Sequence, residues 1–164
     1  MIEQVLNRRN LTLAYRKVVS NKGSAGIDGM PVKELYVHLT KNRQRIESEI
    51  RNGKYLPQPI LGVDIPKSNG KYRLLGIPTV TDRLLQQAVL QAIAIKFEVE
   101  FEDFSYGFRP NRNAQQAVLK AQDYINSGYQ HIVDIDLKNF FDEVDHCILL
   151  QLLYRKVKCP ITLR

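Results

Sequence analysis

The spacing of apolar residues predicts two helices in the first fifty residues of the chain. The first covers about residues 10–19, with Asn10 as its N-cap. Its apolar stripe is formed by Leu11, Ala14, Tyr15 and Val18. After a loop rich in Gly and Ser, Pro31 opens a second helix that runs to about Asn52, where Gly53 stops it.

The pattern then changes from a helical period to the alternation that is typical of strands. Residues 60–65 and 72–77 are short strand candidates, and an Asn-Gly dipeptide lies between them. Such a dipeptide between alternating segments favours a tight hairpin turn. The sequence therefore predicts a β-hairpin that carries Lys67 near its tip and Arg73 on the returning strand.

A long helix is expected directly after the hairpin. Thr79 and Asp82 have the spacing of a capping box, with Asp in place of the usual Glu. The face expected to be apolar consists of Leu85, Val89, Ile93 and Phe97. Residues 98–103 are acidic and end this element.

The last third of the chain is predicted to contain a helix, a strand and another helix. Asn113 is the expected N-cap of the first helix, which ends near Gly128. Its buried stripe is expected to be Ala114, Ala117, Val118, Ala121, Tyr124 and Ile125. Residues 132–137 form the predicted strand and residues 147–157 the final helix. Helices interspersed with strands, two of them in a hairpin, favour an α+β fold.

Composition and charge narrow the class of protein. The chain has 164 residues, of which 44% are hydrophobic and 25% charged, as in one globular domain or one domain and part of a second. Residues 1–80 contain 14 basic and 6 acidic residues, a net charge of +8, whereas residues 81–164 contain 10 and 11, a net charge of −1. This asymmetry favours a bound nucleic acid, and a solvated basic surface is the alternative.

The cysteines and the hydropathy argue against a zinc protein, a disulfide-rich protein and a membrane-spanning protein. Cys147 and Cys159 are the two cysteines, and neither His131 nor His146 completes a spacing typical of zinc sites. A disulfide framework is not expected, which agrees with a reducing, cytoplasmic location. The first ten residues lack an apolar signal core, and no apolar run is long enough to cross a membrane.

Two aspartates give the first indication of chemistry. Asp134 and Asp136 are expected on one face of an otherwise apolar strand, where aspartate is disfavoured and like charges repel. A divalent cation would offset this repulsion, because Mg²⁺ prefers carboxylate oxygens; a solvated strand end is the structural alternative. Phosphatases of the haloacid dehalogenase type and nucleotide-sugar glycosyltransferases also use Asp-x-Asp. Here Leu137-Lys138 follows the pair, which argues against the former, and no nucleotide-binding βαβ unit precedes it.

Four blocks of the sequence resemble group II intron reverse transcriptases. VDIDLKNFFDEVDH resembles their first catalytic motif, and YGFRPNRNAQQAV resembles the loop and helix before it. IPKSNGKYRLLGIPTVTDRLLQQAVLQ resembles their fingers hairpin and the following helix, and GSAGIDGM the segment after their N-terminal extension. The blocks occur in family order. Their second catalytic motif, Tyr-x-Asp-Asp, does not occur in these 164 residues, so we expect a truncated N-terminal fragment that is inactive alone.

The resemblance implies a domain plan and an activity. Residues 1–35 would be an N-terminal extension, residues 36–128 the fingers, and residues 129–164 the start of the palm. The parent protein would be an RNA-directed DNA polymerase with two Mg²⁺ ions, an RNA template, a DNA primer and dNTPs. It would also bind group II intron RNA and aid splicing, and a homodimer is compatible with it. The alternative is a non-enzymatic RNA-binding or maturase module, served by the basic helices of residues 10–52.

The resemblance also assigns roles to individual residues. Asp136 aligns with the catalytic aspartate that binds both metal ions, and the backbone carbonyl of Leu137 would help to hold one of them. Phe141 aligns with the ring that blocks a ribose 2′-OH and so selects deoxynucleotides. The other expected contacts of the dNTP are Lys67, Arg73, Asn139 and Phe140.

Four arginines are candidate nucleic-acid contacts. Arg43 and Arg45 are expected on the exposed face of the second helix. Arg109 and Arg112 belong to the FRPNR loop, where an arginine often braces a turn by binding backbone carbonyls. For this second pair, bracing and phosphate contact are both open readings of the sequence.

Overall fold

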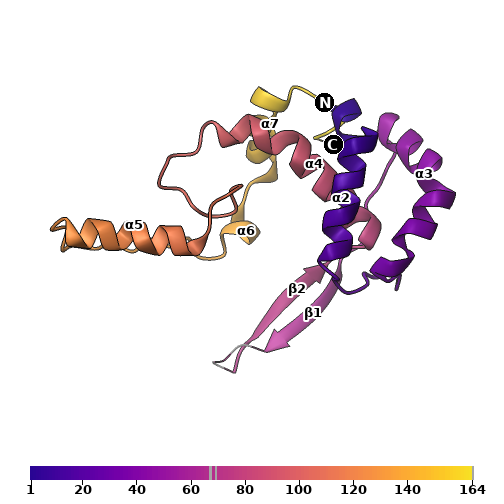
Figure 1. The fold of residues 1–164 in the computed structure, drawn as a ribbon. Coiled ribbons are helices and arrows are strands. Elements are labelled where there is room, and N and C mark those ends of the chain that lie inside the picture. Colours follow the sequence, from indigo (N-terminus) through magenta and orange to yellow (C-terminus); the bar gives the residue numbers. More distant parts are fainter. Residues whose placement is uncertain (67, 69, 164) are drawn as a thin grey trace. The chain divides into compact units, whose positions relative to one another are not determined.

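The computed structural model describes residues 1–66, 68 and 70–163. In chain order the elements are α1 (Ile2–Val5), α2 (Arg8–Ser20), the 3₁₀ helix η1 (Val32–Glu34), α3 (Leu35–Arg51), β1 (Leu61–Pro66), β2 (Tyr72–Ile77), α4 (Val80–Glu98), α5 (Ala114–Asn126), α6 (Phe140–Glu143) and α7 (His146–Val157). Figure 1 labels both strands and the helices α2 to α7. Helices with one small antiparallel sheet confirm the α+β class. The chain divides into a first unit, residues 1–94 and 153–164, and a second unit, residues 95–152.

The first predicted helix is present as α2, but its cap is not the predicted one. Asn7 is the N-cap, and its side chain accepts a hydrogen bond from the backbone N–H of Arg9 at 2.9 Å. The prediction of Asn10 was wrong because Asn10 lies inside the helix. There its side-chain amide donates to the backbone carbonyl of Ala88 at 2.9 Å and so ties α2 to α4. The second predicted helix is present as η1 and α3, and Gly53 follows it with a φ of 63°.

Two apolar clusters form the core of the first unit. One contains Val5, Ala14, Leu84 and Ala88, and the other contains Val18, Leu35 and Val80. The stripe predicted for α2 is confirmed, since Ala14 and Val18 are buried in it. On α4 the predicted Leu85 and Val89 are only partly buried, and the buried apolar positions in that part of the helix are Leu84 and Ala88, one residue earlier. The small side chain of Ala88 packs in the core with Ala14, and the larger Val89 lies partly buried at its edge.

The predicted hairpin is confirmed. β1 and β2 pair in antiparallel register from Leu61 opposite Ile77 to Pro66 opposite Tyr72. Gly70 has a φ of 76° in the turn, a left-handed conformation that glycine adopts readily. Both faces of the hairpin are solvent-exposed over most of their length. Lys67 and the predicted turn residue Asn69 lie outside the residues that the structure describes.

In the second unit the helix α5 forms with the predicted cap. Asn113 and Gln116 exchange hydrogen bonds of 2.9 Å in a capping box, and Gly128 follows the helix with a φ of 98°. The predicted buried stripe is wrong, because Val118 is 67% and Ile125 55% exposed. The period identifies an apolar face, but burial requires a second element packed against that face.

The predicted strand over residues 132–137 is not formed. A strand needs a neighbour to bond its N–H and C=O groups, and within the described ranges the only paired strands are β1 and β2. The short helix α6 follows this segment, and α7 confirms the final predicted helix within one residue. In the described part of the chain no helix is both long and apolar enough for a membrane span.

Candidate nucleotide and nucleic-acid sites

The segment around Asp136 is exposed and turns sharply after the two aspartates. Asp134 and Asp136 are both exposed. Asn139 then adopts a left-handed conformation, with a φ of 52°, and its carbonyl accepts the N–H of Asp142 at 2.9 Å. This turn starts α6 with Phe140, so the aspartates, Leu137, Asn139 and the two aromatic residues occupy one short exposed segment.

The two phenylalanines of α6 lie against each other. Their ring centroids are 5.7 Å apart with an interplanar angle of 61°, an edge arrangement that aromatic pairs favour. Phe140 is about half exposed, whereas Phe141 is 88% exposed. The ring of Phe141 therefore does not serve as core in this unit, and its surface is open to a ligand.

Asp136 offers a carboxylate to a cation but does not complete a metal site. Carboxylate and carbonyl oxygens, as on Asp136 and Leu137, are the donors that Mg²⁺ prefers. Among the described residues, however, no group of three or more His, Cys, Asp or Glu side chains gathers where it could hold a metal ion. A Mg²⁺ ion at Asp136 therefore needs further ligands, and Mg²⁺ binding stays a prediction.

Arg73 lies on the hairpin, opposite Ile65 in the ladder. Because cross-strand partners share a face, Arg73 projects on the same face as Val63 and Leu75, which are each about 40% exposed. The side chain of Arg73 is exposed, as a phosphate contact would require.

The base of the hairpin is organised around a buried carboxylate, Asp82, which is 3% exposed. The hydroxyl of Tyr55 donates to Asp82 Oδ1 at 2.7 Å, while Thr79 Oγ1 and the backbone N–H of Gln58 donate to Oδ2 at 2.6 and 3.2 Å. The N–H of Asp82 donates in turn to Thr79 Oγ1 at 3.1 Å, so Thr79 caps α4 as predicted, while the Asp82 carboxylate accepts from the Thr79 hydroxyl. Burial, and then the bond to Asp82, raise the pKa of the Tyr55 phenol above its ordinary value, so the phenol stays a donor in alkaline solution as well as at neutral pH.

The sequence signal for Asp82 was its capping-box spacing to Thr79. That spacing does not reveal Tyr55 and Gln58, because these donors are 27 and 24 residues away in sequence. The loop of residues 20–30 also packs here. A Cβ at Gly26 would lie 2.7 Å from the Cα of Thr79, so glycine is required for this approach.

Arg109 is used as a brace in its own loop. It donates to Glu98 Oε1 from Nε at 3.0 Å and from Nη2 at 2.9 Å, and Nη1 donates to the carbonyls of Glu102 and Ser105 at 2.6 and 3.0 Å. Its side chain is 7% exposed and lies over the ring of Phe101 at 5.2 Å. These contacts support the bracing reading of the FRPNR loop.

Arg112 is braced less completely. Its Nη1 donates to the carbonyl of Asp103 at 2.7 Å, and its guanidinium lies 5.3 Å from the ring centre of Tyr106. With 27% of its side chain exposed, Arg112 retains more surface than Arg109. A contact of either arginine with nucleic acid stays a prediction.

The two basic helices of the first unit differ in how their charges are used. On α3, Arg43 Nε donates to Glu47 at 2.6 Å and Arg45 Nη1 to Glu49 at 2.7 Å. The helix α2 has no acidic residue, and its exposed cations are Arg8, Arg9, Arg16 and Lys17. None of the ion pairs found between described residues involves a cation of α2.

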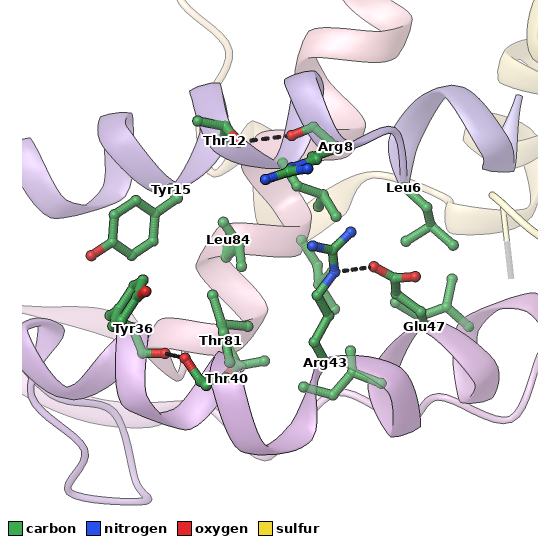
Figure 2. Close-up of a pocket in the computed structure, with 15 residues that line it drawn as sticks. Leu6, Arg8, Thr12, Tyr15, Tyr36, Thr40, Arg43, Glu47, Thr81 and Leu84 are labelled. Atoms are coloured by element: carbon green, nitrogen blue, oxygen red, sulfur yellow. Dashed lines mark hydrogen bonds and ion pairs between the residues drawn. The ribbon is translucent and has the colours of Figure 1, made fainter.

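A groove of about 350 Å³ lies between α2 and α3, with α4 as its floor (Figure 2). Tyr15 and Tyr36 lie at one end, with ring centroids 6.5 Å apart, and Arg43 and Glu47 lie towards the other end. Arg8 projects from α2 on the same side. Aromatic rings beside arginines are a combination that can stack bases and bind phosphates of single-stranded nucleic acid.

The chain belongs to the family described as reverse transcriptase (RNA-dependent DNA polymerase), whose model matches residues 65–163. That range begins in β1 and includes the rest of the hairpin and the Asp136 segment. The family contains polymerases, and its model covers both the exposed Asp136 and the hairpin strand that carries Arg73.

Curated relatives share a similar stretch of sequence. The chain is 37% identical over 153 residues to protein YkfC of Escherichia coli, covering 90% of this chain and 40% of that protein. It is 37% identical over 154 residues to the group II intron-encoded protein LtrA of Lactococcus lactis, covering 89% and 24%. It is 25% identical over 157 residues to the putative COX1/OXI3 intron 2 protein of Saccharomyces cerevisiae, covering 92% and 17%. The chain thus spans 40% or less of the length of these relatives.

Proposed function

We propose that the whole protein containing this chain is the RNA-directed DNA polymerase of a group II intron. The observation that carries the proposal is the family match over residues 65–163, which includes Asp136 and Arg73. The similarity to an intron-encoded protein supports the intron as its origin, and with it a second role in binding intron RNA and aiding splicing. Its expected partners are an RNA template, a DNA primer and dNTPs.

On this proposal the chain forms the fingers and the start of the palm of a right-hand polymerase. Residues 1–35 are the N-terminal extension, residues 36–128 the fingers, and residues 129–164 the first part of the palm. The exposed face of the hairpin lets Arg73 bind phosphate oxygens in a bidentate manner, which suits a guanidinium. Lys67, predicted near the tip, would add a point charge. The exposed ring of Phe141 would lie under the sugar of the dNTP.

Asp136 would contribute one carboxylate to the Mg²⁺ ions of the complete active site. Bound Mg²⁺ would supply the positive charge that stabilises phosphoryl oxygens during transfer. The chain 1–164 contains no Tyr-x-Asp-Asp sequence, so we expect it to be inactive by itself.

Primer extension tests the proposal. The full-length protein is given an RNA template, a DNA primer, dNTPs and Mg²⁺, and incorporation is measured with and without template. We expect template-dependent DNA synthesis by the full-length protein and none by residues 1–164. A full-length protein that extends no primer would overturn the proposal, and synthesis by residues 1–164 would overturn the expected need for further carboxylates.

A second candidate function is a non-enzymatic RNA-binding module, and the unpaired charge of α2 favours it for this chain. Four exposed cations of α2, none of them in an ion pair between described residues, offer a surface for phosphates, and Arg8 also lines the groove that contains Tyr15 and Tyr36. Both functions can belong to one protein. They separate in the assay, since a pure binding module binds RNA but extends no primer.

RNA binding is best tested with two matched charge variants. Arg8→Gln with Arg9→Gln and Arg43→Gln with Arg45→Gln each remove two positive charges. We expect the α2 variant to weaken binding of single-stranded RNA more, because the α3 arginines are already paired with Glu47 and Glu49. Log affinity should fall with log salt, and each lost contact should reduce the slope by about 0.7. Equal losses in the two variants would contradict the assignment of the RNA-binding charge to α2.

A further inference from the structure

The direction in which the hairpin points is set by the residues at its base, where its two strands join the helices. β1 and β2 bond to each other, and most of their side chains are exposed. Figure 1 shows the two strands extending as an arm from the helices of the first unit. The direction of such an arm is set where its two strands leave the helices, at the residues just before β1 and just after β2.

Asp82 contacts both of these points. Before β1, the Tyr55 hydroxyl and the Gln58 N–H donate to its two oxygens. After β2, the hydroxyl of Thr79 donates to the same carboxylate at 2.6 Å. The carboxylate itself belongs to the first turn of α4, which packs through Leu84 in the core. One buried side chain therefore joins both ends of the hairpin to the helical core.

A cap alone does not account for these contacts. Capping of α4 needs only the bond from the Asp82 N–H to Thr79 Oγ1. The bonds from Tyr55 and Gln58 add nothing to the cap, and the bond from the half-buried Tyr55 is short, at 2.7 Å. A carboxylate is also the group that three converging donors require, because it accepts at both oxygens and donates at neither.

We infer that Asp82 is a positioning residue for DNA synthesis, which holds the hairpin in the direction that presents Arg73 to the incoming nucleotide. The inference rests on the proposed polymerase function. Loss of this anchor lets the hairpin tilt, so that the phosphate contact is made less often. The effect should fall on nucleotide binding, since Asp82 touches no reacting atom.

Steady-state kinetics of the full-length protein test this role. Asp82→Asn replaces one acceptor oxygen by a donor, and Tyr55→Phe removes the bond to Oδ1 while leaving the cap of α4 intact. We expect the KM for dNTP to rise about tenfold in Asp82→Asn and about threefold in Tyr55→Phe, with kcat within about twofold of wild type. Thr79→Val should also raise KM, and Thr79→Ser, which keeps the hydroxyl, should restore it.

The matched control is Asp64→Asn, the same chemical change on β1, away from the base of the hairpin. It should leave KM unchanged. An active wild type in which both Asp82→Asn and Tyr55→Phe retain the wild-type KM would overturn the inference alone. If Asp82→Asn does not fold, Tyr55→Phe decides, because it removes one hydrogen bond only. A wild type that extends no primer would overturn the proposed function and this inference with it.

Discussion

The first unit buries ten of its apolar side chains, whereas residues 95–152 bury none of the apolar side chains that the structure describes. Both regions nevertheless have helices with clear apolar faces. In the first unit those faces meet, as Ala14 of α2 and Ala88 of α4 do. In the second unit the apolar side chains of α5 and of residues 132–137 remain exposed, and Asp136 and Phe141 of the proposed active site belong to this unit.

Because of this contrast, we expect substitutions in the two units to affect different properties, stability in the first and activity in the second. Substitutions in the first unit should change the free energy of unfolding, because its side chains have the packed neighbours that make burial stabilising. Substitutions around Asp136 should change activity with little effect on stability, because their side chains are exposed. The free energy of unfolding and the activity can be measured separately for each variant.

The largest effect is expected for Asp136→Ala. In the full-length protein the variant removes a metal ligand, so synthesis with either sugar should fall at least about a thousandfold. In residues 1–164 the midpoint of thermal unfolding should stay unchanged, since the side chain is exposed. Primer extension and thermal denaturation of the two proteins measure both. A clear loss of stability would show that Asp136 is structural and would weaken the contrast.

A large loss of stability is expected for Leu35→Ala in the first unit. Leu35 has no exposed surface and packs with Val18 and Val80. Deleting its side chain should lower the free energy of unfolding of residues 1–164 by about 2–5 kcal/mol. Leu13→Ala, on the exposed side of α2, is the matched control and should cost no more than about 0.5 kcal/mol. Urea denaturation gives both values, and similar losses would contradict the assigned core.

Much of the fold follows from local signals in the sequence. Both hairpin strands, the helices and the caps at Thr79 and Asn113 are set by residues within a few positions of each other. The wrong predictions concern contacts between residues that are far apart in the sequence. Asn7 rather than Asn10 caps α2, because the amide of Asn10 is used at Ala88, 78 residues away. The periodicity of apolar residues cannot predict a contact over that sequence separation.

The sequence proposes a set of residues for the candidate site, whose roles stay predictions, but it does not give their geometry. The motif resemblance identified Asp136 and Phe141, and the turn at Asn139 shows how α6 begins between them. The predicted strand of residues 132–137 failed because strand formation depends on a pairing partner, which the alternation of side chains does not supply. Asp82 was seen only as a cap, since its distant donors meet it through tertiary packing.

Phe141→Ala should have an intermediate effect, on substrate choice. The ring is 88% exposed, and on our proposal it lies under the sugar of the dNTP. Shrinking it makes room for a 2′-OH, so discrimination between dNTP and rNTP should fall by about tenfold or more. Synthesis with dNTPs should fall less. The ratio of kcat/KM for dNTP over rNTP measures this in full-length wild type and variant. An unchanged ratio would place Phe141 elsewhere than at the sugar.

The smallest effect is expected for Val118→Ser in the second unit, compared with the same substitution at Val18 in the first, each in the middle of a helix. Val118 in α5 is 67% exposed and Val18 in α2 is 7% exposed. Serine and valine have similar helix propensities, so the intrinsic cost is near zero at both positions. Val18→Ser removes a buried side chain and introduces a hydroxyl into the core, which should cost about 2–3 kcal/mol. Val118→Ser changes surface that is already in water, so the free energy of unfolding of residues 1–164 should change by less than about 0.5 kcal/mol. A loss at Val118 approaching that at Val18 would mean that the α5 face is packed in solution, and the contrast between the two units would then be wrong.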